Sequence, residues 1–384
     1  MIARIKRKIQ YLYRNVFVER FYGNFLMPLF YNKKYRVDKK SQLELGERIL
    51  IWNIDSLGDS TWITPVLKSL INHDVNLKIT LVHNKVCREL FNYFEDQIEL
   101  IGIDASPFYD PRSIGQEVEE IRARSFDTMF ILEMGARPSD AGRVLGHKLG
   151  VENIVSSNLG HLKDICHYVL PENTDHAPIY WPKYFLKVLE PFSVTKARAS
   201  IELQIPRLNE ENTILIHPVV AGYGLSTKML PISKIINLIK HILKTTDSNI
   251  VITSGPGERK FIQEIFSEIQ TERLIDKCEI LSIRDLIERI NRSKLIICND
   301  TSVLHIATSL KKKIITFFGA TNEFKIADIE NNNVHVLSSQ RECRTCHINK
   351  DSYPYWPKCI YDRAECLYDI SLDEVTKKFD EVIC

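Results

Sequence analysis

Short apolar runs alternate with amphipathic stretches along most of this 384-residue chain. Unbroken apolar runs bounded by polar turns indicate strands that are buried on both faces of a sheet. The predicted strands are 49–54, 77–82, 98–103, 128–132, 213–216, 250–254, 278–281, 295–298 and 314–318. Helical patterns stand between them, and this alternation predicts parallel sheets covered by helices. Because the alternation restarts near residue 200, we expect two successive Rossmann-like domains.

The first 48 residues differ from the rest of the chain in charge. They contain twelve Lys and Arg against four Asp and Glu, whereas the whole chain carries only +2. Ile2, Ile5, Ile9, Leu12 and Val16 recur at helical spacing, so a basic amphipathic helix is expected here. Such a helix either lies on an anionic membrane surface or packs against the protein itself, and the sequence leaves both alternatives open.

The expected location follows from the apolar pattern and the charge. The chain shows no apolar stretch of signal-peptide or membrane-spanning length, which predicts a cytoplasmic protein. It would be peripheral on the inner face of the inner membrane if the basic helix binds lipid. The small net charge gives no case for nucleic-acid binding. Structural disulfides are not expected in that compartment.

A polar turn between the last two predicted strands is the strongest candidate ligand site. Asp300, Thr301 and Ser302 are all of the types that cap helices, so a helix should begin there. A helix N-terminus at the carboxyl end of a parallel strand presents free N–H groups and can hold a phosphate. The same strand–turn–helix pattern occurs in every α/β protein, so the turn alone does not establish a site.

Four of the nine cysteines fall in one short window near the C-terminus. Their spacing is Cys343-x2-Cys346-x12-Cys359-x6-Cys366. A Cys-x-x-Cys pair followed by two further cysteines is a candidate tetrathiolate site for structural zinc or iron. A loop-rich segment without a core of its own gains stability from such a metal. The alternative is four reduced thiols in a loop.

Four motifs of this chain resemble those of glycosyltransferase family 9, the ADP-heptose:lipopolysaccharide heptosyltransferases. The turn at 300–305 and Phe-Gly-Ala-Thr at 318–321 are similar to the family's Asp-Thr-Gly-x-x-His and Phe-Gly-Pro-Thr. The other three motifs are Leu-Gly-Asp at 57–59 before Thr-Pro at 64–65, His-Pro at 217–218 with Ser-Thr-Lys at 226–228, and Gly-Pro-Gly-Glu at 255–258. The chain departs from the family pattern at Ser302, Ala320, Val219 and Met229-Leu230. The resemblance extends over residues 49–383.

The resemblance implies the GT-B fold, an α/β architecture in which two Rossmann-like domains face a cleft. Four segments are then expected. They are a basic amphipathic extension at 1–48, an acceptor domain at 49–199, a nucleotide-sugar domain at 200–340, and a Cys-rich loop with a C-terminal helix at 341–384. Helices of this kind commonly fold back on the first domain in GT-B proteins.

The resemblance also implies residue roles. Asp59 matches the family's base toward the acceptor hydroxyl, although an aspartate there could instead cap the following helix. Lys228 matches the lysine that neutralises the leaving diphosphate, so no catalytic metal or cofactor is expected. The implied substrate contacts are Gly58, Ser226, Thr227, Glu258, Asp300, Thr301, Ser302, His305, Gly319 and Thr321. The implied metal ligands are Cys343, Cys346, Cys359 and Cys366.

The implied function is inverting transfer of a heptose from ADP-heptose, or a similar nucleotide sugar, to a hydroxyl of a lipopolysaccharide core or other surface glycan. Two alternatives stay open. The cysteine cluster favours a protein Ser or Thr as the acceptor, because some protein-heptosylating relatives bind iron through such a cluster. The departures at Ser302, Val219 and Met229 favour a non-catalytic protein that binds a sugar nucleotide.

Overall fold

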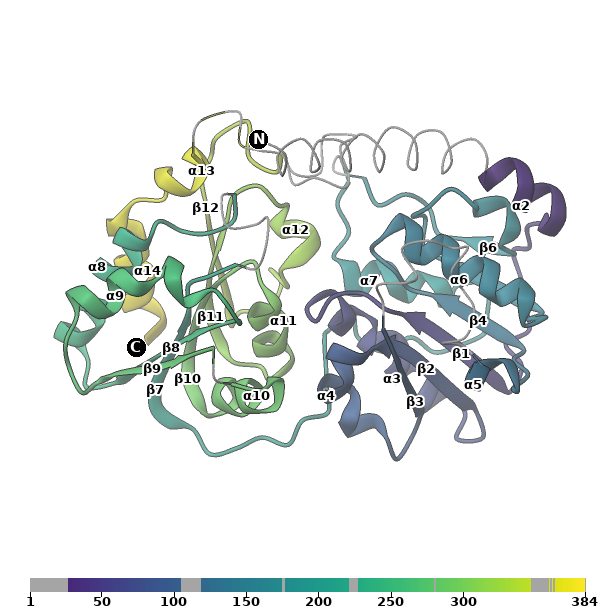
Figure 1. Ribbon diagram of the computed structural model, residues 1–384, viewed down its shortest axis with the longest axis horizontal. Coiled ribbons are helices and arrows are strands. Elements are labelled where there is room, and N and C mark those ends of the chain that lie inside the picture. The colour runs from purple at the N-terminus through teal and green to yellow at the C-terminus, as the bar shows by residue number, and fades with distance from the viewer. Residues whose placement is uncertain are drawn as a thin grey trace, which may run out of the picture. The chain divides into compact units, whose positions relative to one another are not determined.

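The computed structural model describes residues 27–104, 119–174, 177–220, 227–279, 281–346, 359, 361 and 363–383. The expected N-terminal amphipathic helix, Ser226 and part of the Cys-rich loop therefore lie outside the described residues. The chain forms two compact units (Figure 1). The first comprises the chain up to Asn173 together with Pro182–Ala199, and the second comprises Thr174–Trp181 and everything from Ser200 onward.

The first unit is built on a six-stranded parallel sheet with the order β3-β2-β1-β4-β5-β6. Its strands are β1 (Arg48–Asn53), β2 (Lys78–Asn84), β3 (Glu99–Ile103), β4 (Thr128–Ile131), β5 (Asn153–Ser156) and β6 (Tyr168–Val169). The central strand β1 is an unbroken apolar run, and five of its six residues are buried. A strand covered by helices on both faces needs such a run.

Helices and single turns connect these strands. They are α2 (Met27–Tyr35), η2 (Asp59–Ile63), α3 (Thr64–His73), η3 (Lys85–Cys87), α4 (Arg88–Phe91), η4 (Asn92–Phe94), α5 (Glu119–Arg122), α6 (Ala136–Lys148), η8 (Lys163–Ile165), α7 (Trp181–Phe185) and η9 (Leu186–Leu189). On one face of the sheet, Ala141, Val144 and Leu145 of α6 pack against Leu50 and Trp52 of β1. Pro65 stands in the first turn of α3, where a proline costs no helical hydrogen bond.

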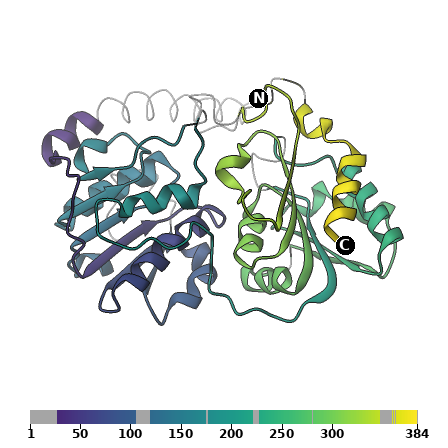
Figure 2. The ribbon, with the colours of Figure 1, turned by 180° about the vertical axis from the view of Figure 1, so that it is seen from behind.

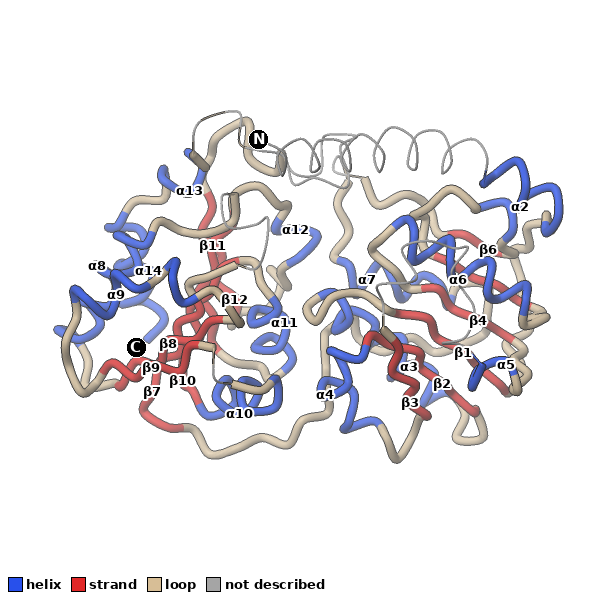
Figure 3. The backbone as a smooth tube through the Cα atoms, in the orientation of Figure 1, coloured by secondary structure: helices blue, strands red, loops and turns tan. Residues whose placement is uncertain are grey.

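The second unit repeats the arrangement with the strand order β12-β11-β10-β7-β8-β9, again all parallel. Its strands are β7 (Glu211–His217), β8 (Asn249–Ser254), β9 (Leu274–Cys278), β10 (Ser293–Asn299), β11 (Lys313–Phe318) and β12 (Val334–Ser338). Its helices are α8 (Ile232–Thr245), η11 (Arg259–Phe261), α9 (Gln263–Glu268), α10 (Ile283–Arg292), α11 (Ser302–Ser309), α12 (Glu323–Ile326), α13 (Glu365–Asp369) and α14 (Leu372–Ile383). Figure 3 shows the strands of each unit between their helices.

Both sheets have the strand order of doubly wound nucleotide-binding folds, in which the chain starts in the middle and builds outward in both directions. The order reverses between β1 and β4 in the first unit and between β7 and β10 in the second. At such a point the two following loops leave the carboxyl ends of neighbouring strands in opposite directions, which opens a crevice for a ligand. The expected α/β class with two Rossmann-like halves is confirmed.

The C-terminal helix α14 packs within the second unit. Val375, Phe379 and Val382 of α14 share a buried cluster with residues of α8 such as Ile235 and Ile239. The two helices lie side by side in both views (Figure 2). Ser371 and Glu374 form a capping box at the start of α14. The Ser371 hydroxyl oxygen accepts from the Glu374 backbone N–H, and the Glu374 carboxylate accepts from the Ser371 backbone N–H and hydroxyl.

The sequence pattern misplaced or missed the outer strands. The strand expected at 278–281 is wrong, because β9 ends at Cys278. Strand β9 is an edge strand with an aspartate and a lysine in its middle, so it shows no apolar run. Strand β12 at the other edge of this sheet was not predicted, and neither were β5 and β6 at one side of the first sheet.

Candidate functional site

Most of the charged residues singled out in the sequence follow the strands at which each sheet reverses its order. In the first unit Asp59 follows β1, and in the second Asp300 follows β10 while Lys228 lies in the connection after β7. The same positions bind ligands in doubly wound folds. Each unit therefore has its candidate residues at the place that its topology favours, and we describe the two units separately.

The centre of the second unit's site is an ion pair between Lys228 and Asp300. The Lys228 Nζ lies 2.7 Å from the Asp300 Oδ2, and the two side chains are only 11% and 6% exposed. The Thr321 hydroxyl donates to the same Asp300 Oδ2 at 2.8 Å. His305 is buried, and the charges of Asp300 and Lys228 both affect its pKa. The structure thus brings four of the predicted residues together.

The electrostatics of this cluster keep its carboxyl group ionised. Burial opposes the charged form of Asp300, but the Lys228 ammonium, His305 and the Thr321 hydroxyl together lower the pKa of the Asp300 carboxyl. Burial lowers the pKa of His305 to about 4, and Lys228 adds to this effect while Asp300 opposes it. His305 is therefore neutral at physiological pH and offers a hydrogen bond, not a charge.

Asn299, the last residue of β10, holds the surrounding loops in place. Its amide nitrogen donates to the Pro218 carbonyl at 2.8 Å, and its Oδ1 accepts from the Leu230 backbone N–H at 3.0 Å. The side chain is fully buried. It therefore ties the loop after β7, which carries Lys228, to the end of the strand that carries Asp300. This role of Asn299 was not predicted from the sequence, although a polar residue at the end of a buried strand was a signal for it.

Helix α11 begins at Ser302, as its capping residues predicted, and Thr301 occupies the N-cap position. The Thr301 side chain makes no capping hydrogen bond. Within the part of the chain that the structure describes, the buried hydroxyl oxygens of Thr301 and Thr227 have no hydrogen-bond partner. A buried hydroxyl without a partner costs free energy, so a polar ligand at this helix N-terminus would find two groups in need of a partner.

Two other residues predicted to contact the substrate, Glu258 and Gly319, accept hydrogen bonds from backbone N–H groups of the protein. The Glu258 Oε2 accepts from the Gly255 backbone N–H at 2.7 Å, so this carboxylate closes its own turn. The Gly319 carbonyl accepts from the Thr345 N–H at 2.9 Å. A Cβ on Gly319 would stand 2.9 Å from the Cys366 Sγ, which explains the glycine sterically. The donor-side turn is therefore backed by the cysteine-containing segment.

In the first unit the predicted turn leads from β1 into the short helix η2. Asp59 is the first residue of η2, and Gly58 precedes it in an ordinary helical conformation with φ −70°. The Ser56 hydroxyl donates to the Asp59 Oδ2 at 3.0 Å. Asp59 is partly exposed, so its carboxylate remains within reach of a ligand in this crevice. The expected positions of Gly58 and Asp59 at the end of the strand are observed.

A pair of buried carboxyl groups beneath this turn had no role in the sequence analysis. Asp55 follows β1, and Glu133 follows β4 across the point where the strand order reverses. Burial and the charge of Asp59 raise the pKa of Asp55 to about 8, although Glu133 and the Met134 backbone N–H oppose this rise. Burial and the charge of Asp55 raise the pKa of Glu133 further. The apolar strand before Glu133 gave no signal that a buried acid would follow.

The four C-terminal cysteines approach one another in the second unit. Burial raises the pKa of the Cys366 thiol to about 11, and the nearby Cys346, Cys343 and Cys359 raise it as well. All four are free thiols. Among the described residues, no group of three or more His, Cys, Asp or Glu side chains has the arrangement of a metal site. No helix in the described ranges is long and apolar enough to cross a membrane.

Comparison with solved structures identifies the class of fold. A glycosyl transferase family 9 protein from Veillonella parvula matches with a TM-score of 0.72 and 18% identity, over 89% of this chain and 99% of that chain. The ADP-heptose lipopolysaccharide heptosyltransferase II of Escherichia coli matches with a TM-score of 0.66 and 14% identity, over 88% and 98%. The iron-containing dodecameric glycosyltransferase TibC of enterotoxigenic E. coli matches with a TM-score of 0.50 and 10% identity, over 89% and 77%. The fold is that of GT-B glycosyltransferases.

Sequence comparison finds a similarity to one family. The model of glycosyltransferase family 9 (heptosyltransferase) matches residues 188–356, which contain the Lys228–Asp300 cluster. Lipooligosaccharide heptosyltransferase 2 of Campylobacter jejuni is 21% identical over 332 residues, covering 85% of this chain and 96% of that protein. The chain is similar to glycosyltransferase family 9, as the motifs predicted, and is a glycosyl-transferring enzyme.

Proposed function

We propose that this enzyme transfers a heptosyl group from ADP-heptose to a hydroxyl of a lipopolysaccharide core or related surface glycan, with inversion and without a catalytic metal. The observation that carries the proposal is the buried Lys228–Asp300 ion pair at the N-terminus of α11. The names of the relatives support the substrates, since they include lipooligosaccharide and ADP-heptose lipopolysaccharide heptosyltransferases. The two proposed catalytic residues are Asp59 and Lys228.

Lys228 would bind the diphosphate of the donor and stabilise it as it leaves. When the bond between the anomeric carbon and the diphosphate breaks, negative charge develops on the phosphate oxygen. The Lys228 ammonium and the free N–H groups at the start of α11 supply positive potential there. Asp300 holds the ammonium in place at 2.7 Å. The unpartnered hydroxyls of Thr227 and Thr301 would contact the phosphates or the sugar.

Asp59 would act as the general base. The acceptor oxygen forms the new bond to the anomeric carbon, its proton passes to the Asp59 carboxylate, and ADP departs with the electron pair of the broken bond. Attack from the face opposite to the leaving group gives inversion. The Ser56 hydroxyl, which donates to Asp59 Oδ2 at 3.0 Å, would fix the orientation of this carboxylate.

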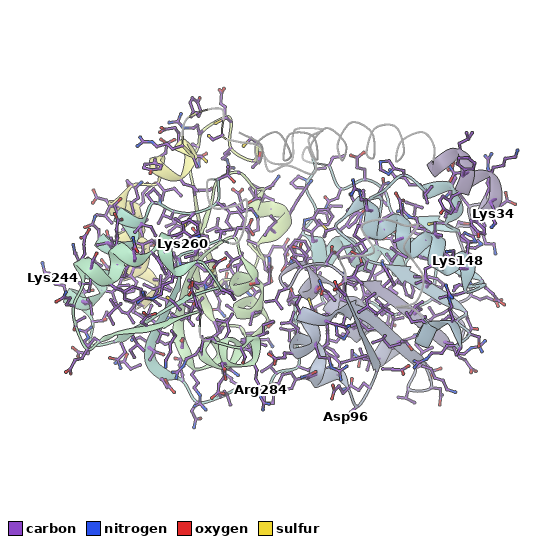
Figure 4. The ribbon with its side chains drawn as sticks, in the orientation of Figure 1. Lys34, Asp96, Lys148, Lys244, Lys260 and Arg284 are labelled. Carbon is purple, nitrogen blue, oxygen red and sulfur yellow. The ribbon has the colours of Figure 1, made fainter. Side chains whose placement is uncertain are left out.

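The test compares Asp59→Ala with Asp96→Ala, an exposed aspartate of the same unit that is labelled in Figure 4. Asp59→Ala should lose transfer, by about 100-fold or more for a missing general base, and should still bind ADP. Lys228→Ala should weaken ADP binding, and Asp96→Ala should change neither property. Turnover retained by Asp59→Ala would remove Asp59 from the proposed role.

A second candidate function is transfer to a protein Ser or Thr. The specific observation that favours it is the proximity of the four C-terminal cysteines, together with a fold shared with TibC, which is described as iron-containing. Incubation with a surface protein in parallel with truncated lipopolysaccharide, and detection of the labelled product, separates the two acceptors. Labelling of the glycan alone would exclude the protein acceptor.

The cysteine cluster fits a structural zinc or iron ion in its chemistry. The other three cysteines raise the pKa of the Cys366 thiol, and a bound cation would stabilise all four as thiolates. The ligands would be Cys343, Cys346, Cys359 and Cys366. Elemental analysis of the purified protein should find about one metal ion per chain. The Cys343→Ser variant should lose this metal, and the Cys87→Ser variant should retain it. Folded protein that carries almost no metal would contradict the proposal.

The membrane association implied by the basic N-terminal residues is also a proposal. Residues 1–26 of this segment lie outside the described part of the chain. If they bind anionic lipid at the inner face of the inner membrane, deleting residues 1–26 should reduce binding to anionic vesicles and leave binding to neutral vesicles unchanged. Equal vesicle binding before and after the deletion would contradict it.

A further inference from the structure

Asp55 and Glu133 form a reciprocal connection between two neighbouring strands of the first unit. The Asp55 Oδ2 accepts from the Met134 backbone N–H at 2.7 Å, just beyond the end of β4. The Glu133 Oε1 accepts from the Ile54 backbone N–H at 2.6 Å, just beyond the end of β1. Each acid thus binds the amide beside the other acid. Beyond the ends of β1 and β4 the backbone hydrogen bonds of the sheet stop. There the two carboxyl groups hold together the two loops that border the crevice.

The environment of the second carboxyl oxygen of Glu133 indicates that this side chain carries a proton. Glu133 is fully buried and Asp55 is 9% exposed. Among the described residues, no N–H or O–H group donates to the Glu133 Oε2. An ionised oxygen without a donor in such a place would be very costly. A proton on Glu133 that is donated to Asp55 removes the problem, and each of the two carboxyl groups shifts the pKa of the other.

The pair lies directly beneath the turn that presents Asp59. Asp59 is the fourth residue after Asp55, and the Asp55 carbonyl accepts from the Ser60 hydroxyl at 3.3 Å. The titratable groups that face the pair are Asp59 from η2 and Cys87 from η3. Burial raises the pKa of the Cys87 thiol to about 12, so this cysteine stays neutral. The charge that the pair senses is therefore that of Asp59.

We propose that the Asp55–Glu133 pair is the positioning element of the acceptor base, holding the Asp59 turn in place and setting its basicity through the charge on Asp55. This rests on the proposed role of Asp59. The proton stays on Glu133 while Asp55 gains or loses its charge near pH 8. When Asp55 ionises, its negative charge raises the proton affinity of Asp59, which strengthens the base. The transfer rate should therefore rise as the pH increases through about 8.

Three substitutions separate positioning from simple structural support. Glu133→Gln keeps both interactions, because its amide oxygen can accept from Ile54 and its NH2 group can donate to Asp55. Asp55→Asn removes the titrating charge, and Glu133→Leu removes the donor to Asp55. The exposed Asp96→Asn serves as the control for the loss of one carboxylate in the same unit.

The first measurement is kcat against pH. Glu133→Gln should retain the rise near pH 8. Asp55→Asn should lose the rise and lower kcat above it by about tenfold or more, the scale of an impaired general base. Glu133→Leu should move the rise to higher pH, because Asp55 loses the hydrogen bond that favours its ionised form. Unchanged profiles in both Asp55→Asn and Glu133→Leu would overturn the proposal, even if these variants were less stable.

The second measurement does not depend on catalysis. Infrared difference spectra taken above the Asp55 pKa of about 8, where Asp55 is ionised, should show a protonated carboxyl C=O band that is absent in Glu133→Gln and retained in Asp59→Ala. If the band is present but Asp59→Ala still transfers sugar, the proton assignment stands and the proposed base fails. If wild-type protein has no band that Glu133→Gln removes, the proton assignment fails whatever Asp59 does.

Discussion

Replacing Lys228 by methionine tests how the second unit depends on its buried ion pair. The substitution keeps the length of the side chain and removes the ammonium that lies 2.7 Å from Asp300. The Asp300 carboxylate, only 6% exposed, then keeps the Thr321 hydroxyl as a donor but loses its counter-charge. Removing one partner of a buried pair costs about 3–5 kcal/mol, and Lys228 is 11% exposed, so we expect the lower end, about 3 kcal/mol.

The pH dependence of this loss has a definite sign. The native pKa of Asp300 is lowered, so its pair stabilises the protein above the unfolded pKa near 4 and loses this effect as the pH falls through the native value. In Lys228→Met, burial acts on Asp300 without opposition from the ammonium, which raises its pKa. Asp300 can then take up a proton on mild acidification, so the deficit of the variant should be smaller at pH 5 than at pH 7.

Differential scanning calorimetry measures the loss, and hydrogen exchange of β10 and α11 assigns it to the second unit. A loss of about 3 kcal/mol corresponds to a decrease in Tm of roughly 6–12 °C for a unit of this size. Adding Asp300→Asn to Lys228→Met should recover at least about 1 kcal/mol, because no buried charge is then left without a partner. A loss below about 1 kcal/mol, or a double variant no more stable than Lys228→Met, would refute this reasoning.

Two further predictions concern packing and a second buried ion pair. Gly319→Ala would place a methyl group 2.9 Å from the Cys366 Sγ and should cost about 1–3 kcal/mol, which thermal unfolding measures; Cys366→Ala should relieve part of the loss only if this contact is the cause. In Asp140→Asn, the buried Arg143 guanidinium, 2.8 Å from Asp140, loses its counter-charge at a cost of about 3–5 kcal/mol. The native pKa of Asp140 is lowered, so this deficit should shrink below pH 4, and urea unfolding that shows an equal deficit at pH 3.5 and pH 7 would contradict it.

The central strands and the donor-side cluster could be predicted from sequence because their physical signals are local. Strands β1, β7, β10 and β11 are buried on both faces and read as unbroken apolar runs. The turn at Asp300 carries capping residues, and helix α11 begins where they predict. The order of the strands then brings the loop of Lys228 beside that turn, which sequence spacing alone does not show.

The outer strands and the buried acids could not be predicted in the same way. Strand β9 lies at a sheet edge, where it needs an apolar pattern on only part of its surface, and Asp276 pairs with Arg259 outside the sheet. Glu133 looks like a surface residue in the sequence, because acidic side chains are rarely buried alone. Its burial depends on Asp55, which is 78 residues away in the chain and adjacent only because β1 pairs with β4.

The two units use the same strand order but stabilise their buried carboxyl groups in opposite ways. Asp300 is paired with an ammonium and stays ionised, so its site gathers a fixed cation at a helix N-terminus. Asp55 is paired with Glu133, another acid, which keeps its proton, so this site contains negative charge and proton-binding groups. A departing diphosphate requires the first environment, and a base that accepts a proton requires the second. If each unit contributes one half of the reaction, a change in one pair should not affect the other. Lys228→Glu, which replaces the ammonium with a second acid, should abolish ADP binding and leave the pH at which Asp55 titrates unchanged. A shift in that titration would contradict this division.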